Sequence, residues 1–252
     1  MKSLGILPAR FASSRWPGKL LQDLAGKSIL QRTWEQAQKA ALLEEVLIAT
    51  DDERLYDHAL QFGARVLRTA TTHRSGTDRC AEAMEQLNEQ PAVVLNIQAD
   101  EPFLDPAYID QVLAMLEAGA EIATVAHLIR QEAELHDPAA VKVVFDRAGH
   151  ALYFSRSPVP HLRDVPVGEW LQHHRFYRHI GLYGFRANVL RRITRFLPGR
   201  LEDCEKLEQL RWMEGGLSIQ VGLVAGTSLG MDTPADLERA KQWLASGSST
   251  SI

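Results

Sequence analysis

Short apolar runs alternate with amphipathic helical patterns over the first half of the chain, and this rhythm constrains the fold more than any other feature. The apolar runs fall at residues 4–7, 46–49, 65–68, 92–98 and 122–128, with helical patterns between them at 27–41, 53–62, 77–87 and 106–117. Strands that alternate with helices of this length form βαβ units. The run from Val93 to Ile97 has the continuous apolarity of a strand buried on both faces. The pattern therefore predicts an α/β fold around a mostly parallel central sheet.

The rhythm changes between about residues 128 and 185. Strand-like pieces at 141–145, 151–154 and 180–185 are separated there by polar segments that contain proline and histidine. We interpret 128–185 as a smaller inserted antiparallel segment that covers a substrate or forms a dimer. The α/β rhythm then resumes, with helices predicted at 187–196, 202–214 and 234–244 and a strand at 218–224, so residues 1–252 are predicted to form a single domain. The tail 246–252 is expected to be disordered.

Three cations, Arg10, Arg15 and Lys19, lie in the loop that follows the first predicted strand. Open α/β sheets bind ligands at the carboxyl ends of their strands, and clustered cations there suit a polyphosphate. The alternative is a solvated surface loop, but loops this long in a compact domain are usually functional or disordered. The glycine spacings of the P-loop and of the dinucleotide-binding fingerprint are absent, since Lys19 is followed by Leu20 and no GxGxxG occurs.

Two carboxylates are candidates for a metal site. Asp100 ends the predicted central strand and therefore faces the same edge of the sheet as the cationic loop. Mg²⁺ prefers hard oxygen ligands and usually shares protein carboxylates with substrate phosphates. The alternative for Asp100 is a turn, because Asp-Glu-Pro is also good turn chemistry. Asp232 is the second carboxylate. Its alternative is simply to precede the capped helix start at Thr233 without binding a metal, and the sequence is equally compatible with both roles.

Other polar motifs are compatible with ligand binding or with a structural role. Ser75 and Gly76 open a predicted helix, where they could hold an anion or a base edge, or act as a plain helix cap. His179 and Tyr183 share the polar face of a predicted strand that could meet a polyhydroxylated acid. A zinc site around the neighbouring histidines lacks a supporting cysteine or third-ligand spacing. A further polar set, which could equally be a solvated face, shares one side of the predicted helix 202–214: Glu202, Glu205 and Gln209.

Charge and cysteine content argue against several classes of protein. The net charge of −4 provides no global basic field for nucleic acid. Cys80 and Cys204 cannot form a disulfide framework, which suits a reducing cytosol. We see neither a signal-peptide core nor a run of about 18 apolar residues, so we expect a soluble, intracellular protein.

The cationic loop belongs to a series of motifs that run through nearly the whole chain. In order they are Pro8-Ala9-Arg10-Phe11-Ala12-Ser13-Ser14-Arg15-Trp16-Pro17-Gly18-Lys19, His73-Arg74-Ser75-Gly76-Thr77-Asp78-Arg79, Gln98-Ala99-Asp100-Glu101-Pro102, Ala140-Val141-Lys142-Val143-Val144, Ala151-Leu152-Tyr153-Phe154-Ser155-Arg156, Arg178-His179-Ile180-Gly181-Leu182-Tyr183-Gly184-Phe185-Arg186, Leu207-Glu208-Gln209-Leu210-Arg211 and Asp232-Thr233-Pro234. Together they closely resemble the 3-deoxy-manno-octulosonate (Kdo) cytidylyltransferases, the CMP-Kdo synthetases. The first loop alone would indicate only a nucleotidyltransferase, and the later motifs narrow the resemblance to this family.

The resemblance implies a Rossmann-like nucleotidyltransferase fold, dependence on Mg²⁺, a cytoplasmic location and a homodimer formed partly through the inserted segment. The implied reaction is CTP + Kdo → CMP-Kdo + diphosphate, for lipopolysaccharide biosynthesis, with no nucleic-acid or membrane partner. The implied catalytic residues are Arg15, Lys19 and Asp100. The implied CTP-binding residues are Ala9, Arg10, Arg15, Lys19, Arg74, Ser75, Gly76 and Gln98. The implied sugar-acid residues are Gln98, Arg156, His179, Tyr183, Glu202, Glu205 and Gln209, and the implied metal ligands are Asp100 and Asp232.

Two positions depart from the family pattern. Ala99 stands where glycine is usual, and Phe11 replaces a common tyrosine. We expect the added methyl group of Ala99 to be tolerated, and Phe11 lacks any hydrogen bond that the tyrosine hydroxyl would make, but neither change alters the implied class of reaction. The nearest rival is a cytidylyltransferase for a related acidic sugar, such as an amino-Kdo or a sialic acid. A non-catalytic nucleotide-binding regulator on the same fold is a rival from another class, but such a module has no need of metal-ligating carboxylates.

Overall fold

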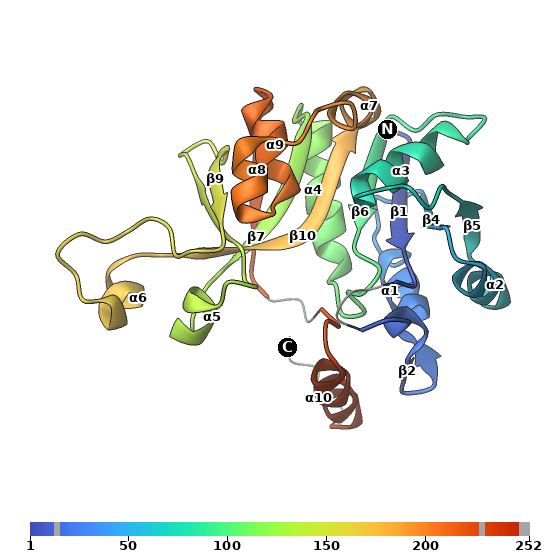
Figure 1. Ribbon diagram of the computed structural model, residues 1–252, viewed down its shortest axis with the longest axis horizontal. Coiled ribbons are helices and arrows are strands. Elements are labelled where there is room, and N and C mark those ends of the chain that lie inside the picture. Colours follow the sequence, from blue (N-terminus) through green and yellow to red (C-terminus); the bar gives the residue numbers. More distant parts are fainter. Residues whose placement is uncertain (13–15, 227–229, 247–252) are drawn as a thin grey trace.

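A computed structural model describes residues 1–12, 16–226 and 230–246, and in it helices cover both faces of one central sheet (Figure 1). The strand order is β11-β7-β10-β6-β1-β4-β5. All neighbours in this order pair in parallel except β10, which is antiparallel to both β6 and β7. The strands are β1 (Ser3–Ala9), β4 (Glu45–Thr50), β5 (Arg65–Arg68), β6 (Val93–Ile97), β7 (Ile122–Leu128), β10 (Tyr177–Arg186) and β11 (Ile219–Val224). The predicted α/β fold with a mostly parallel sheet is confirmed.

Each face of the sheet has its own hydrophobic core. One face is covered by α1 (Ile29–Ala37), α2 (Glu53–Gln61) and α4 (Pro106–Glu117), and α10 (Pro234–Ala245) contributes to the same hydrophobic cluster from beyond the edge of the sheet. The other is covered by α3 (Gly76–Glu85), α7 (Ala187–Ile193) and α9 (Glu208–Glu214). The capping residues that start α3 and α4 are Ser75 and Asp105, whose side chains accept from main-chain amides of the first turn. No helix within the described residues has the length and apolarity needed to cross a membrane.

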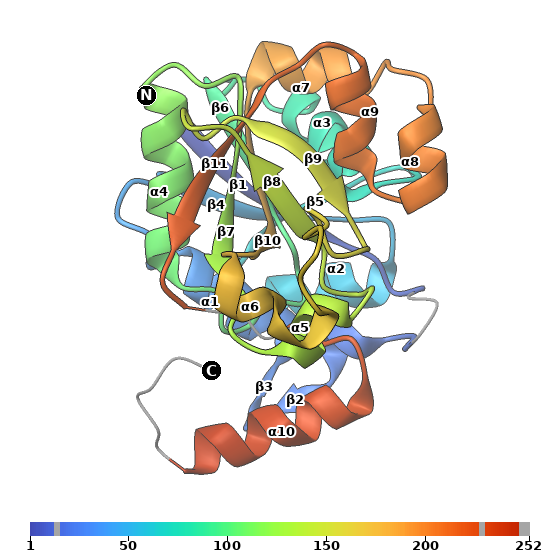
Figure 2. The ribbon, with the colours of Figure 1, turned by 90° about the vertical axis from the view of Figure 1, so that its left-hand side faces the viewer.

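Most predicted elements lie within a few residues of the observed ones, and the first helix is shorter at both ends than predicted. Residues 27 and 28 were predicted to be helical, but Lys27–Ser28 is strand β3, which forms a hairpin with β2 (Asp23–Leu24). The Ser28 side chain accepts from the amide of Gln31, so the helix begins at Ile29. α10 contacts the β2–β3 hairpin, as Figure 2 shows.

The prediction of one helix over 202–214 is wrong. The chain forms two helices there, α8 (Arg200–Glu205) and α9, separated by Lys206 and Leu207. Lys206 has a φ of 53° and donates its N–H to the Glu202 carbonyl (2.7 Å), which closes α8 with a left-handed residue. Glu205 and Gln209 therefore lie on different helices, and the shared helical face predicted for them does not exist.

The inserted segment leaves the sheet after β7 and returns as β10. It contains α5 (Glu132–His136), the antiparallel hairpin β8 (Lys142–Phe145) and β9 (Ala151–Ser155), the short 3-10 helix η2 (Val167–Glu169) and α6 (Trp170–His173). α6 lies far from the sheet on the left of Figure 1. A small hydrophobic core of Ile129, Leu135, Trp170 and Phe176 stabilises the inserted segment. The predicted range 128–185 thus includes β10, which lies inside the main sheet between β6 and β7.

Replacing Gly184 with alanine is expected to lower the free energy of unfolding by about 1–3 kcal/mol. Gly184 lies on β10 where α4 crosses it, and an added Cβ would approach Val112 Cγ1 to 2.5 Å and Leu116 Cδ1 to 2.7 Å. Urea unfolding measures the change. The matched control is Gly168→Ala on exposed η2, where the nearest atom to an added Cβ is 3.9 Å away. Equal stability of the two variants would contradict the packing argument.

Candidate active site

Lys19 meets two carboxylates at the carboxyl edge of the sheet. Its Nζ lies 2.5 Å from Asp100 Oδ2 and 3.1 Å from Asp232 Oδ1. Asp100 follows β6, and Asp232 precedes α10. The Met231 amide donates to the Asp100 carbonyl (2.9 Å), which fastens the two segments to each other. The structure therefore brings Lys19 together with Asp100, which lies 81 positions later in the chain, and with Asp232, which lies 213 positions later.

The loop that carries Lys19 is bent at Gly18. Its φ of +72° favours glycine, and its N–H donates to the Phe11 carbonyl (2.9 Å). A Cβ at this position would lie 3.0 Å from the Phe11 ring, so the space is also closed. Arg54, from α2, places its Cζ 3.3 Å from the centroid of that ring, a cation–π contact that ties the loop to the helix. The predicted phosphate ligand Arg15 lies outside the described residues.

The two carboxylates keep the Lys19 ammonium charged. Burial lowers the pKa of Lys19, but the charges and hydrogen bonds of Asp100 and then Asp232 outweigh this effect and raise the pKa above its ordinary value. The Lys19 side chain is only 11% exposed. Its charge is therefore less screened than that of a surface lysine, and it suits the stabilisation of negative charge on a nearby ligand.

A cleft of about 360 Å³ opens beside Lys19 and Asp100. Its lining consists of Pro8, Arg10, Ala12, Lys19, Leu20, Gly76, Gln98, Ala99 and Asp100. Four of the predicted CTP-binding residues are in this lining, and a fifth, Ala9, is fully buried at the end of β1. The volume lies within the range of small-molecule sites. Ala99 is 4% exposed and forms part of the cleft wall, so its methyl group is accommodated.

The remaining predicted CTP-binding residues, Arg74 and Ser75, lie in a neighbouring groove. This groove has a volume of about 530 Å³ and runs between the start of α3 and the α8–α9 region. Arg74 is exposed, and Ser75 caps α3. Because Gly76 lines the cleft and Ser75 lines the groove, the first residues of α3 form the ridge between the two.

His179 and Tyr183 lie together on β10, with ring centroids 4.9 Å apart. Burial, with a smaller effect of the Arg178 charge, lowers the pKa of His179 to about 3. Its Nε2 lies 2.9 Å from the Thr124 hydroxyl oxygen. Burial and the charge of Glu208 raise the pKa of Tyr183 well above its usual value. Both side chains are therefore neutral at pH 7.

The neutral His179 makes a pH-dependent contribution to stability. Its folded-state pKa of about 3 lies below the ordinary value of 6.5, so this contribution is complete above pH 6.5 and is lost as the pH falls toward 3. We expect the stability advantage of the wild type over His179→Gln to shrink by about 2 kcal/mol between pH 7 and pH 5. Parallel urea titrations at the two pH values measure this difference. A difference that does not change with pH would contradict a neutral imidazole in the folded state.

Three predicted sugar-acid residues, Arg156, Glu205 and Glu202, have polar partners within the protein. Arg156 donates through its guanidinium to the carbonyls of Glu205 (2.7 Å), Pro138 (2.9 Å) and Lys206 (3.4 Å). The Glu205 carboxylate accepts from the Ser155 hydroxyl (2.7 Å) and the Arg156 amide (2.9 Å). Glu202 pairs with Arg211, whose Nε lies 3.3 Å from the Glu202 carboxylate in the groove. The fourth predicted residue, Gln209, is buried and only 5% exposed. Their roles toward a sugar acid stay predictions.

Glu208 is a candidate that the sequence analysis did not select. Its carboxylate accepts from the Thr77 hydroxyl (2.8 Å) and from Arg211 (2.8 Å), and it lines the groove. Burial raises the pKa of Glu208, although hydrogen bonds from Thr77 and Ser75 oppose the shift. The buried Tyr183 hydroxyl has no hydrogen-bond partner within the described chain. Perturbed titratable groups in a groove are typical of functional sites. The only sequence signal was its place in the Leu207–Arg211 motif.

Asp100 and Asp232 form a donor set that fits Mg²⁺. Their oxygens already converge on one cationic group, the Lys19 ammonium. Within residues 1–12, 16–226 and 230–246 no group of three or more His, Cys, Asp or Glu side chains is arranged to hold a metal. One or two carboxylates, completed by water and substrate phosphates, are the usual protein ligands of Mg²⁺, whereas zinc takes a closed set of nitrogen or sulfur ligands.

Comparisons with known proteins converge on one group. Residues 4–219 match the family model described as Cytidylyltransferase. A 3-deoxy-manno-octulosonate cytidylyltransferase of Parabacteroides distasonis is 45% identical over 97% of this chain and 99% of its own length. A protein of the same name from Bacteroides thetaiotaomicron is 44% identical over 97% and 98% of the two chains.

Solved structures agree with the predicted nucleotidyltransferase fold. The structure of a CMP:2-keto-3-deoxy-manno-octonic acid synthetase complexed with CTP superposes with a TM-score of 0.90 and 36% identity, over 98% of this chain and all of the other. A 4-diphosphocytidyl-2C-methyl-D-erythritol synthase from Anaerococcus prevotii gives a TM-score of 0.62 at 14% identity over 97% and 99% of the two chains, which shows a shared fold alone.

Proposed function

Because this chain belongs to the cytidylyltransferase family, among the 3-deoxy-manno-octulosonate cytidylyltransferases, we propose that it transfers CMP from CTP to the anomeric hydroxyl of Kdo and releases diphosphate. The observation that carries the proposal is the position of Lys19 between Asp100 and Asp232, at the edge of a cleft at the carboxyl ends of the strands. A ligand-sized cleft with cations and carboxylates on one wall suits a nucleoside triphosphate.

The reaction needs positioning and charge neutralisation more than a protein nucleophile. The anomeric oxygen of the sugar forms a bond to the α-phosphorus as it loses its proton, and the bond from that phosphorus to diphosphate breaks in line. Lys19, with Arg10 and Arg15, would hold the phosphates and stabilise the leaving diphosphate. Ala9, Arg74, Ser75, Gly76 and Gln98 would surround the base and ribose.

Asp100 and Asp232 would hold Mg²⁺ in the loaded enzyme. When bound, this ion neutralises phosphate charge and makes the attacking hydroxyl more acidic. Lys19 pairs with both carboxylates, so its ammonium offsets one of their two negative charges and would lie close to the phosphates. The three side chains thus form one charge cluster on which the triphosphate would lie.

The sugar acid would occupy the space between the end of β6 and the groove. Gln98 lines the cleft, and its Cγ is 3.2 Å from an ideal Cβ on Gly181 of β10, the strand that also carries His179 and Tyr183. We retain as sugar-acid candidates the set Arg156, Glu202, Glu205 and Gln209, to which we add Glu208. Three of the five N–H donors of Arg156 are bound to main-chain carbonyls, so two would be left for a bidentate contact with the Kdo carboxylate.

We infer the wider setting from the family. The enzyme would act in the cytoplasm, as a homodimer formed partly through the inserted segment, and its product would serve lipopolysaccharide assembly. A nucleic acid is not expected as a partner, since the net charge is −4, and neither is a membrane, since the sequence has no run of about 18 apolar residues. The rival substrate is a related acidic sugar, and the less favoured rival function is a non-catalytic nucleotide-binding regulator.

Diphosphate is expected only when CTP, Mg²⁺ and Kdo are all present. A coupled assay for diphosphate, with each component left out in turn, checks this requirement. Replacing Kdo by an amino-Kdo or a sialic acid in the same assay identifies the sugar. Tight CTP binding with no release of diphosphate under the complete conditions would contradict the proposed enzyme activity and favour a non-catalytic nucleotide-binding regulator.

A further inference from the structure

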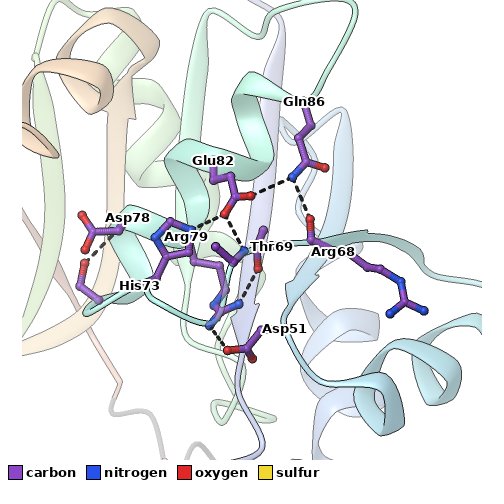
Figure 3. Close-up of polar contacts among 10 residues, drawn as sticks. Asp51, Arg68, Thr69, His73, Asp78, Arg79, Glu82 and Gln86 are labelled. Carbon is purple, nitrogen blue, oxygen red and sulfur yellow. Dashed lines mark hydrogen bonds and ion pairs between the residues drawn. The ribbon is translucent and has the colours of Figure 1, made fainter.

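One face of α3 carries polar side chains toward the segment that follows β5. Arg79, Glu82 and Gln86 lie three and four positions apart, the spacing that places side chains on one helical face. Figure 3 shows all three directed at the chain from Arg68 to His73. This segment leads directly into Arg74 and Ser75.

Arg79 joins the ends of two strands to the helix. Its guanidinium donates to Asp51, which follows β4, at 2.9 Å, and to the hydroxyl of Thr69, which follows β5 (Figure 3). Arg79 is 1% exposed and Thr69 is 8% exposed. A buried charge is stable only when it is paired and hydrogen-bonded, so this arrangement fixes where β5 ends relative to α3.

Glu82 and Gln86 hold the next residues. The Glu82 carboxylate accepts from the Ala70 amide (2.8 Å) and contacts the Nε2 atom of His73. Gln86 donates from its amide to the Arg68 carbonyl (2.8 Å) and to Glu82 (3.3 Å). Main-chain and side-chain groups from residue 68 to residue 73 are thus fastened to one helix.

These bonds compensate for the position of β5 in the sheet. β5 is the last strand in the order, and in the part of the chain that the structure describes it pairs only with β4. After Thr69, whose amide still donates to the Thr50 carbonyl (3.0 Å), the segment pairs with no strand of the described residues. Its path to the ridge at Ser75 and Gly76 therefore depends on the α3 face.

We propose that Arg79, Glu82 and Gln86 form a latch that positions residues 69–75 for nucleotide binding, so that these side chains set the affinity for CTP without touching it. The inference rests on the proposed function, because CTP is the ligand that Arg74, Ser75 and Gly76 would meet. The three latch residues are positioning residues.

Glu82→Ala is the principal test, because this half-buried side chain can be removed with less risk to folding than Arg79. We expect the Kd of CTP, measured by calorimetry without sugar acid, to rise about tenfold. The KM for CTP rises with it, whereas kcat and the KM for the sugar acid stay within about twofold. The Ala70 amide, freed of its acceptor, exchanges its hydrogen faster. Glu82→Gln keeps an acceptor for that amide and is expected to restore most of the CTP affinity.

Glu85→Ala is the matched control. Glu85 lies on the same helix and pairs with Arg191 of α7, so the variant loses an ion pair without touching the latch. CTP affinity and Ala70 exchange are expected to stay at wild-type values. Arg79→Lys, which keeps the charge near Asp51 but lacks the fork that reaches Thr69, should weaken CTP binding in the same direction as Glu82→Ala.

The outcomes separate the latch from the proposed function. A wild-type protein that does not bind CTP overturns the proposed function. Wild-type CTP binding that Glu82→Ala leaves unchanged overturns the latch alone. A Glu82→Ala protein in which kcat falls, both KM values rise and Tm is lower would show general destabilisation. This result also overturns the latch.

Discussion

Lys19→Met is expected to lower the rate of diphosphate release by about 10³-fold or more. Lys19 is the described cation whose charge is least exposed to solvent at the cleft, at 11% side-chain exposure. Charge that develops on the leaving diphosphate would be met there by an ammonium that two carboxylates already orient. Methionine preserves the apolar stem and removes only the charge and its hydrogen bonds. The assay is run with saturating CTP, so that the loss is read in kcat.

Two further variants make this result specific. Lys39→Met changes an exposed lysine that contacts Gln36 and should leave the rate unchanged. Lys19→Arg keeps the charge with a different geometry and should retain more activity than Lys19→Met. A loss of less than about tenfold in Lys19→Met would remove Lys19 from the transition-state contacts.

Asp100→Asn is expected to abolish turnover to a similar degree, a fall of about 10³-fold. The amide keeps the size of the side chain, but it lacks the negative charge that pairs with Lys19 at 2.5 Å and that would ligate Mg²⁺. Any residual rate should need more Mg²⁺ for half-maximal activity. Diphosphate release across a Mg²⁺ titration measures both effects, and circular dichroism verifies that the fold is intact.

Asp105→Asn supplies the same chemical change nearby. Asp105 caps α4 by accepting from the Ala107 amide (2.9 Å), and asparagine caps helices equally well. This variant should keep wild-type activity and stability. Turnover retained by Asp100→Asn would exclude Asp100 from the metal site and would leave Asp232 as its remaining described candidate.

The central sheet could be predicted because its strands are buried on both faces and interrupted by helices of ordinary length. The run Val93–Ile97 is fully apolar apart from Asn96, and it is the strand β6 at the centre. The sequence could not indicate that β10 enters this sheet antiparallel between β6 and β7, because strand order depends on pairing across distant segments. The break between α8 and α9 could not be predicted either, because Lys206 adopts a left-handed conformation without a glycine or proline to mark it.

The site was predicted to the extent that its residues follow strand ends. Lys19 and Asp100 come after β1 and β6, and the carboxyl ends of neighbouring parallel strands meet at one edge. Glu208 was missed because a charged residue at the start of a helix is usually solvated. Its burial depends on Thr77 from a helix 131 positions earlier, and no local pattern records that contact.

The charge cluster joins distant parts of the chain, so the active site is expected to form late in folding. Lys19 must find Asp232 across 213 residues, after every strand of the sheet has been added. Contacts of such long sequence separation form late, since the entropy of closing the intervening chain is offset only once the sheet exists. On the ribosome, the sheet can assemble while the second carboxylate is still unmade. Catalytic ability is therefore expected to appear in one late step, when α10 docks beneath the β2–β3 hairpin, and partially folded chains should carry a cleft that does not yet react.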